Sequence, residues 1–422
     1  MEEEARPSKK PRGAAGSGLT AFALRTAKQL AEGEGADGCS KNKNLVFSPL
    51  SIYAALALVA AGARGATLDE LLALLGAPSR DELAEFARGV AERALADLSG
   101  SGGPLVAFAC GVWHEKTLPL KPAYCAAAIE TYRAETRAAD FKNKAEAREE
   151  INSWVSEATK SLISSILPPD SVHSTTGLVL ASAVYFKGMW SLPFDKKETE
   201  TRQFRLLDGS HVRTPFMKNR RRSYQAVRSC DGFKVLKLAY LPYQMPTRHC
   251  YGPNKQQDEK LPRFSMCVFL PNANDGLPRL VDRMAASGPS FLWDHLPNVR
   301  VKVGEFWLPK FKLSFSGELD RVLKAMGVEA AFNELRVDLS DMLEDSVPLV
   351  VEQVFHKAVI EVDEEGTVAA GFSAGSSRTL QTARRDVDFV ADHPFAFFVV
   401  EEASGAVVFM GHVLDPTASS SD

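Results

Sequence analysis

Residues 371–375 read Gly-Phe-Ser-Ala-Gly, which matches the G-x-S-x-G motif that holds the nucleophile of many serine hydrolases. Such a serine needs a buried strand before it and a helix after it. Here residues 363–367 are too polar for a central strand, and residues 376–381 show no apolar helical pattern. His393 and His412 follow too closely for a large α/β core to form in between. We therefore interpret Ser373 as a residue that does no catalysis, and we expect no enzyme activity.

The other residues that could do chemistry are scattered along the chain. None of the eight histidines lies in an H-x-x-x-H pair, and the six cysteines form no C-x-x-C pair, so we expect neither a metal nor another cofactor. The net charge of -3 offers no general attraction to nucleic acid or to an anionic membrane. No apolar run is long enough to cross a bilayer.

The N-terminus is charged and lacks the apolar stretch of a secretory signal peptide, so we expect an intracellular protein with free thiols. Residues 1–18 are expected to form a disordered tail. Within this tail Lys9, Lys10 and Arg12 form a candidate nuclear-import signal, and the alternative is a solvated basic tail. The expected location is therefore the cytoplasm, and also the nucleus if this signal acts.

The segment around the G-x-S-x-G match, residues 364–385, shows a two-residue alternation. Every bulky side chain between 367 and 378, such as Phe372 and Arg378, falls in one set, whereas all members of the other set are small: Thr367, Ala369, Gly371, Ser373, Gly375 and Ser377. Because a strand sends alternate residues to opposite faces, this segment could lie as a strand with its small face on a packed layer. Its glycines and serines nevertheless make it a poor strand. A flexible surface linker with accidental alternation remains the alternative.

Helices and strands are mixed along the chain, with helices prevailing early and strands late, which favours an α+β fold. Helix starts are predicted at Ser48-Pro49, at Thr67 with Glu70, and at Ser79 with Glu82, with a stop at Gly76. Helical spacing also covers residues 151–162 and 319–326. The strand signals lie at residues 178–186, 233–240, 264–270, 306–315, 350–362, 387–400 and 406–413, and the last two are expected to form a hairpin.

Many motifs in order resemble the serpin family, and plant-type intracellular serpins in particular. They are NLVFSPLSIYAALALVAAGARGATLDELLALLG (44–76), INSWVSEATKSLISSILP (151–168), LVLASAVYFKGMWSLPF (178–194), LPKFKLSFSGELDRVLKAMGV (308–328), VFHKAVIEVDEEGT (354–367) and DFVADHPFAFFVV (388–400). The resemblance implies one serpin domain over residues 19–416, with three β-sheets, eight or nine helices and an exposed reactive loop at about 364–386, followed by a short tail at 417–422.

The resemblance also implies a mechanism. A target protease cleaves the loop and forms an acyl-enzyme, and the loop then inserts into sheet A as a new strand that traps the protease covalently. The expected partner is a serine protease or a papain-like cysteine protease, and the inhibitor is expected to be a monomer. Family loop length places the cleaved bond at Leu380-Gln381, with Arg378 as the alternative. The hinge by resemblance comprises Glu364, Glu365, Gly366, Thr367, Val368, Ala369, Ala370 and Gly371.

Resemblance further assigns Ser48, Ser51 and His356 to the shutter beneath the opening sheet, and Trp190 to the breach where insertion begins. Three departures bear on function. Val368 stands where inhibitors usually carry an acidic residue, Phe372 interrupts a run of small residues, and Ser182 replaces the usual shutter asparagine. The alternative is therefore a non-inhibitory serpin, a binding or structural protein that is cleaved without trapping a protease.

Overall fold

The computed structural model describes residues 13–32, 43–218, 224–241, 262–344, 347, 349–365 and 386–418. Nine α-helices lie within these ranges: α1 (Gly13–Glu32), α2 (Pro49–Gly62), α3 (Gly65–Leu75), α4 (Arg80–Ala94), α5 (Pro122–Tyr132), α6 (Lys144–Ala158), α7 (Leu277–Ser287), α8 (Ser290–Asp294) and α9 (Asp320–Ala325). Together with the strands they confirm the predicted α+β class.

One sheet has five strands in the order β11-β12-β4-β2-β3. Its strands are β2 (Leu105–Glu115), β3 (Glu135–Ala139), β4 (Leu178–Lys187), β11 (Phe311–Glu318) and β12 (Gln353–Val362). The pairs β11–β12 and β2–β4 are antiparallel, whereas the central pair β12–β4 is parallel. The middle of this sheet is therefore a parallel seam between two antiparallel pairs.

The other strands form a second hydrogen-bonded assembly in the order β1-β15-β14-β9-β8-β7-β10-β6-β5, with β13 beside β10. Two residue pairs between β7 and β10 join the two parts of this assembly. If these parts are counted as separate sheets, the described residues form three sheets together with the five-stranded one. The strands are β1 (Leu45–Phe47), β5 (Glu200–Arg205), β6 (His211–Lys218), β7 (Tyr224–Cys230), β8 (Phe233–Ala239), β9 (Phe264–Pro271), β10 (Val301–Pro309), β13 (Val387–Val390), β14 (Phe395–Glu401) and β15 (Ala406–Val413).

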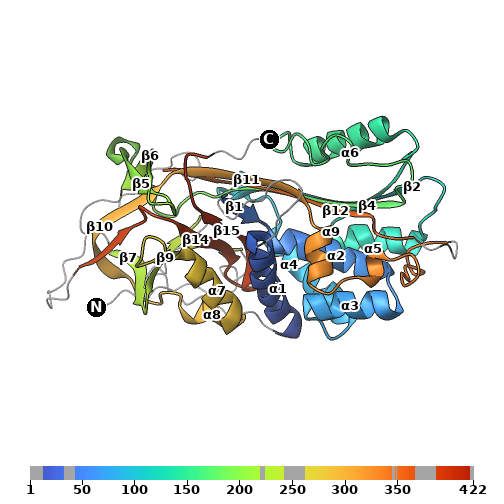
Figure 1. Cartoon of the computed structure of the whole chain (residues 1–422), viewed down its shortest axis with the longest axis horizontal. Helices are drawn as coiled ribbons and strands as arrows, with labels where there is room; N and C mark the ends of the chain where they lie inside the picture. The colour runs from blue at the N-terminus through green and yellow to red at the C-terminus, as the bar shows by residue number, and fades with distance from the viewer. Residues whose placement is uncertain are drawn as a thin grey trace, which may run out of the picture.

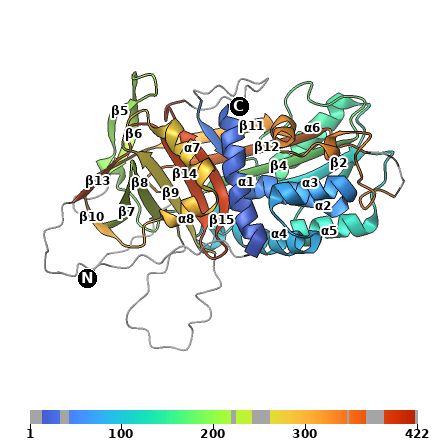
Figure 2. The same cartoon turned by 60° about the horizontal axis from the view of Figure 1, so that its bottom comes forward.

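Helix α6 covers part of one face of the five-stranded sheet, and α2 lies on the opposite face (Figure 1). On one face, Val179, Ala183 and Phe355 pack with Ile151 and Trp154 of α6 in a separate small core. The opposite face joins the main core, which includes α2 and the strands of the second assembly. Helices α7 and α8 lie over β9 and β14 in that assembly (Figure 2). The seam is therefore buried between α6 and α2.

Local capping chemistry confirms several predicted helix ends. The Ser48 side chain accepts a hydrogen bond from the N–H of Ser51, with Pro49 in the first turn. The Ser79 side chain likewise accepts from the N–H of Glu82. Gly76 ends α3 in the left-handed conformation at φ 63°.

The predicted tail boundary at Gly18 is wrong, because α1 begins at Gly13. Gly18 lies against the end of α3, where a Cβ atom would come within 2.1 Å of the Leu75 carbonyl oxygen. The absence of a side chain lets the two helices approach this closely. Residues 13–18 therefore belong to the folded part of the chain, and a single serpin domain over residues 19–416 stays a prediction.

The predicted capping box at Thr67 is also wrong, because α3 begins two residues earlier at Gly65. The Thr67 hydroxyl is fully buried and accepts from the N–H of Asp338 instead. Leu162 likewise lies beyond α6, which ends at Ala158. Lys160 and Ser161 then adopt left-handed backbone conformations, at φ 54° and 61°, and turn the chain out of the helix.

Two predicted strands are each divided in two. Residues 306–315 break after Pro309, where the chain passes from β10 to β11 and hence between sheets, with the N–H of Lys310 donating to the Pro215 carbonyl. Residues 387–400 break at 391–394, between β13 and β14. Pro394 there lacks the N–H that a strand ladder needs. The predicted hairpin of the last strands is confirmed, since β14 pairs antiparallel with β15.

Candidate functional site: the seam between two parallel strands

The candidate site is the seam where β4 and β12 pair directly. Eight residue pairs connect them in register, from Gln353 opposite Val179 to Ile360 opposite Phe186. The chain leaves β12 at the Phe186 end and runs through residues 363–365 toward the segment predicted to be the reactive loop. A strand that followed β12 and turned back would run antiparallel to both neighbours, because these two are parallel to each other.

Three predicted shutter residues meet under the middle of the seam. The N–H of Ser48 donates to Nε2 of His356 at 3.0 Å. Nδ1 of the neutral ring therefore carries the proton, and it faces Oγ of Ser182 across the seam at 3.5 Å. Ser182 in turn hydrogen-bonds Oγ of Ser51. The cluster thus joins β12, β4 and the start of α2.

Burial fixes the charge state of this cluster. His356 is fully buried, and burial lowers its pKa to about 3, so the ring is neutral near pH 7. His356 and Ser182 are direct partners in the strand register. Separating β4 from β12 would break their contact while leaving the bond to Ser48 free to persist.

The predicted breach residue Trp190 lies where the seam ends. Its indole Nε1–H donates to the backbone oxygen of Asp363 at 2.8 Å, and its backbone N–H donates to that of Glu365 at 3.4 Å. Its ring stacks on Tyr240 with centroids 4.3 Å apart. Trp190 therefore holds the first residues after β12 in place.

The predicted hinge residue Glu364 is anchored more firmly than its neighbour Glu365. Its carboxylate accepts from Thr199 Oγ1 at 2.7 Å and pairs with Lys310 Nζ at 2.7 Å, and its backbone oxygen accepts from Phe194 N–H. Burial opposes ionisation, but the bonds from Lys310 and Thr199 outweigh it and hold the pKa of Glu364 below its ordinary value. Glu365 makes an exposed ion pair with Lys196.

A further ion cluster spans three strands at the same end of the sheet. Lys187 of β4 pairs with Glu361 of β12 at 2.9 Å and with Asp363 at 3.2 Å, and Lys312 of β11 pairs with Glu361 at 2.6 Å. Burial opposes ionisation of Glu361, yet the bonds from Lys312 and Lys187 lower its pKa. Lys187 thus ties the two seam strands together at the end where the chain leaves β12.

Sequence reasoning missed Lys187, Glu361, Lys310, Thr199 and Tyr240. The first two stand at the ends of predicted strands, where a charge is a common solubilising feature, so the sequence offered no functional signal. Lys310 and Thr199 are far from Glu364 in sequence, and only the fold brings them together.

Several predicted site residues lie outside the described residues. They are the hinge residues Gly366, Thr367, Val368, Ala369, Ala370 and Gly371, the loop residue Phe372, the bond Leu380-Gln381 with its alternative Arg378, and the basic residues Lys9, Lys10 and Arg12. Their roles remain predictions.

The two histidines that follow the G-x-S-x-G match are committed to other contacts. His393 Nδ1 lies 2.8 Å from Asp392 Oδ1, which resembles a catalytic pair, but Nε2 of the same ring bonds the Pro271 carbonyl oxygen at 2.8 Å. A general base would need that nitrogen free for the serine. His412 Nε2 bonds the carbonyl oxygen of Lys43. Among the described residues, no group of three His, Cys, Asp or Glu side chains is placed to hold a metal ion.

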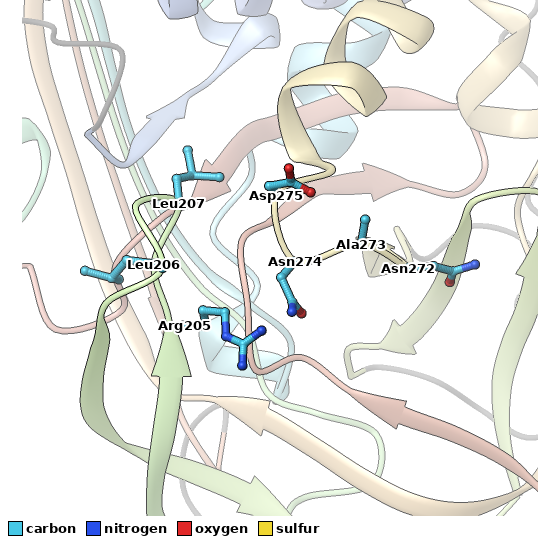
Figure 3. Close-up of a pocket in the computed structure, with 8 residues that line it drawn as sticks. Arg205, Leu206, Leu207, Asn272, Ala273, Asn274 and Asp275 are labelled. Atoms are coloured by element: carbon cyan, nitrogen blue, oxygen red, sulfur yellow. The ribbon is translucent and has the colours of Figure 1, made fainter.

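A surface cavity of about 470 Å³ lies between the turn after β5 and the segment before α7 (Figure 3). Its lining comprises Arg205, Leu206, Leu207, Gly209, Asn272, Ala273, Asn274 and Asp275. None of these belongs to β4, β12 or residues 363–365, so the cavity is separate from the seam. Within the described ranges no helix is both long and apolar enough to cross a membrane.

Comparisons with known proteins agree with this geometry. Residues 17–416 match the family model described as Serpin (serine protease inhibitor). Serpin-Z2A of Oryza sativa subsp. japonica is 54% identical, with 96% of this chain and 98% of the relative covered, and Serpin-Z7 of Hordeum vulgare is 44% identical, with 95% and 96% covered.

Solved structures are similar over nearly the whole chain. The structure of Arabidopsis AtSerpin1 in its native stressed conformation has a TM-score of 0.82 and 38% identity, covering 96% of this chain and 98% of that one. Uncleaved ovalbumin has a TM-score of 0.77 and 26% identity, with 96% and 100% covered. The chain belongs to the serpin family of protease inhibitors, and its relatives include the plant serpins of the Z type.

Proposed function

We propose that the protein is a suicide-substrate inhibitor of serine proteases, and of papain-like cysteine proteases as a further class, that acts as a monomer. The protease cleaves the loop at Leu380-Gln381 and is held as an acyl-enzyme, with its catalytic serine or cysteine bonded to the carbonyl carbon of Leu380 and the Gln381 amine released. The loop then enters the seam between β4 and β12 and carries the protease with it.

The observation that carries this proposal is the direct parallel pairing of β4 with β12. An inserted strand would replace one parallel interface with two antiparallel ones, and antiparallel pairing is slightly more stable per residue. About fifteen residues that each gain roughly 0.5–1.5 kcal/mol from ladder hydrogen bonds would supply on the order of 10 kcal/mol.

The packing under the seam supports the small-residue face of the loop. Leu180, Val184 and Ala358 of the seam strands are fully buried in the main core toward α2. An inserted strand would need small side chains on this face. The alternating set of small residues from Thr367 to Ser377 would supply such side chains.

The test is an inhibition assay on denaturing gels. The purified protein is incubated with chymotrypsin, trypsin and papain, and covalent complexes and the released C-terminal peptide are examined. We expect a detergent-stable complex and a new N-terminus at Gln381. A new N-terminus at Thr379 would instead assign Arg378 as the cleaved residue.

A pair of variants separates insertion from cleavage. Thr367→Arg places a charge on the small face and should convert the inhibitor into a substrate that is cleaved without complex. Val368→Arg adds the same charge on the opposite face and should retain complex formation. Clean cleavage of the wild-type protein without complex and without a gain in thermal stability would favour the non-inhibitory serpin.

A further inference from the structure

The surface cavity of about 470 Å³ beside β5 carries polar side chains that the seam does not use. One wall is the turn that follows β5, with Arg205 and Leu207, and the other is the segment that leads into α7, with Asn274 and Asp275 (Figure 3). Small-molecule sites in proteins typically have volumes of about 300–1,000 Å³. The cavity is therefore large enough for a small ligand.

Both walls are anchored on the same two neighbouring residues, Asp392 and His393. The N–H of Arg205 donates to the carbonyl oxygen of Asp392 at 2.8 Å. Nε2 of His393 bonds the carbonyl oxygen of Pro271, the residue from which the second wall starts, at 2.8 Å. Because the two walls share one anchor, the cavity keeps its shape before a ligand arrives, and a preformed site lowers the entropic cost of binding.

Three polar side chains of the cavity are not committed to other parts of the protein. Nε of Arg205 donates to Nε2 of His211 at 3.3 Å, but neither terminal nitrogen of its guanidinium is bonded to another described residue. The side chains of Asn274 and Asp275 likewise make no hydrogen bond or ion pair within the described ranges. The charge of Arg205 also acts on Asp392, but that carboxylate is bonded to the adjacent histidine ring. The three groups can therefore bind a ligand.

These groups offer different chemistry at different places in the cavity. Figure 3 shows the guanidinium of Arg205 and the amide of Asn274 pointing into the same space, whereas Asp275 is drawn away from them, toward the start of α7. A guanidinium binds a carboxylate through two parallel hydrogen bonds, and an amide can donate a further one. The ionised carboxylate of Asp275 only accepts bonds, so it favours an ammonium group. Leu207 and Ala273 add apolar surface to the lining.

We propose that this cavity is a binding site for a short peptide with free termini, whose carboxylate binds Arg205 and Asn274 and whose ammonium group binds Asp275. A ligand with a single charge would leave one of the two charged side chains without a partner, so the geometry favours a zwitterion over a simple anion or amine. The lining shares no residue with the seam, and the proposal does not depend on protease inhibition.

The test is calorimetric titration of the intact protein with trialanine, with trialanine amide and with N-acetyl-trialanine, where each modified peptide lacks one terminal charge. We expect one site per chain for trialanine and about threefold to tenfold weaker binding of each modified peptide, because the contacts are charged but exposed to solvent. Arg205→Gln should remove the preference for trialanine over its amide. Asp275→Asn should remove the preference over the N-acetyl peptide.

Two matched control variants remove the same charges nearby. Arg213 is exposed on β6 and Asp282 is exposed on α7, and neither lines the cavity. Arg213→Gln and Asp282→Asn should therefore bind all three peptides as the wild-type protein does. A general effect of net charge would instead weaken binding in the controls as much as in the cavity variants.

Three results would overturn the inference. The first is no binding of trialanine at up to about 10 mM, by calorimetry or by a rise in Tm. The second is equal binding of the three peptides, which would mean that the termini are not recognised. The third is an equal loss of binding in the cavity variants and the controls. Protease trapping is read separately on gels, so none of these results bears on the proposed function.

Discussion

The contacts of Glu364 give the most direct test of how the start of the predicted reactive loop is held. Glu364→Gln keeps the shape of the side chain and removes its charge. The side chain is 5% exposed, and it pairs with Lys310, which is 35% exposed, and accepts from Thr199. Phe194 still donates to the backbone oxygen in the variant, so only the side-chain contacts are changed.

The expected cost follows from these contacts. A hydrogen bond to a charged group contributes about 1.5–3 kcal/mol, and solvent screening reduces the part that comes from the half-exposed Lys310. We expect Glu364→Gln to lower the free energy of unfolding of the intact protein by about 2 kcal/mol at pH 7, or about 2 °C in Tm for a chain of this size.

Glu365→Gln provides the matched control one residue away. Its ion pair with Lys196 is exposed, with Lys196 62% exposed, and exposed pairs contribute little. The control should therefore leave the urea midpoint unchanged. If both substitutions shift the midpoint equally, or neither does, the anchor assigned to Glu364 is wrong.

The pH dependence of the Glu364→Gln effect is a second check. Because the native pKa of Glu364 lies below its ordinary 4.5, the carboxylate stabilises the native state above pH 4.5, and this contribution is lost as the pH falls through the lowered pKa. The difference between wild type and variant should be constant from pH 6 to 8 and shrink in acid. A difference that grows on acidification would contradict the ion pair.

Three further predictions concern the seam and its covering helix. Ser182→Ala leaves the Ser51 hydroxyl and Nδ1–H of His356 buried without this partner, and should lower the free energy of unfolding by about 1–3 kcal/mol in urea titrations. His356→Gln should flatten the pH dependence of the free energy of unfolding. The native ring stays neutral down to a pH of about 3, whereas the unfolded ring takes up a proton below its ordinary pKa of 6.5. The wild-type protein should therefore lose about 2 kcal/mol of stability from this group between pH 6.5 and 5. Ser161→Gly should stabilise the intact protein by about 0.5–1 kcal/mol, because Ser161 is exposed at φ 61°, and an unchanged urea midpoint would show that its backbone is not strained.

The parts of the fold that could be predicted depend on local chemistry. The side chains of Ser48 and Ser79 accept hydrogen bonds from N–H groups three residues later, so these helix caps can be predicted from a few neighbouring residues. Gly76 similarly marks a left-handed helix end. The strand break at Lys310 was not visible, because the residues on both sides remain apolar and alternating while the chain changes sheets. Periodicity reports which face is buried but not which sheet buries it.

The candidate site likewise contains residues that the sequence could predict and residues that it could not. The residues matched by resemblance, Ser48, Ser51, His356 and Trp190, all lie on the seam or at its end. The pairs that hold the hinge could not be found, because Glu364 and Lys310 are charged residues of ordinary type and only the fold places them 2.7 Å apart.

The serpin resemblance predicts an asparagine at the position of Ser182, and the contacts that the serine makes bear on how readily the seam can open. The serine is shorter, and its oxygen reaches only to 3.5 Å from His356 Nδ1, which is a long contact, whereas Ser48 N–H bonds the same ring at 3.0 Å. His356 is thus held mainly by the start of α2 and weakly by the strand across the seam. When β4 moves away from β12, the contact of Ser182 with His356 must break, and the bond of Ser182 with Ser51 must break too if α2 stays with β12. The short side chain therefore leaves the direct polar contact between the two strands weak, and α2 carries the stronger bonds, to β12 through Ser48 and to β4 through Ser51.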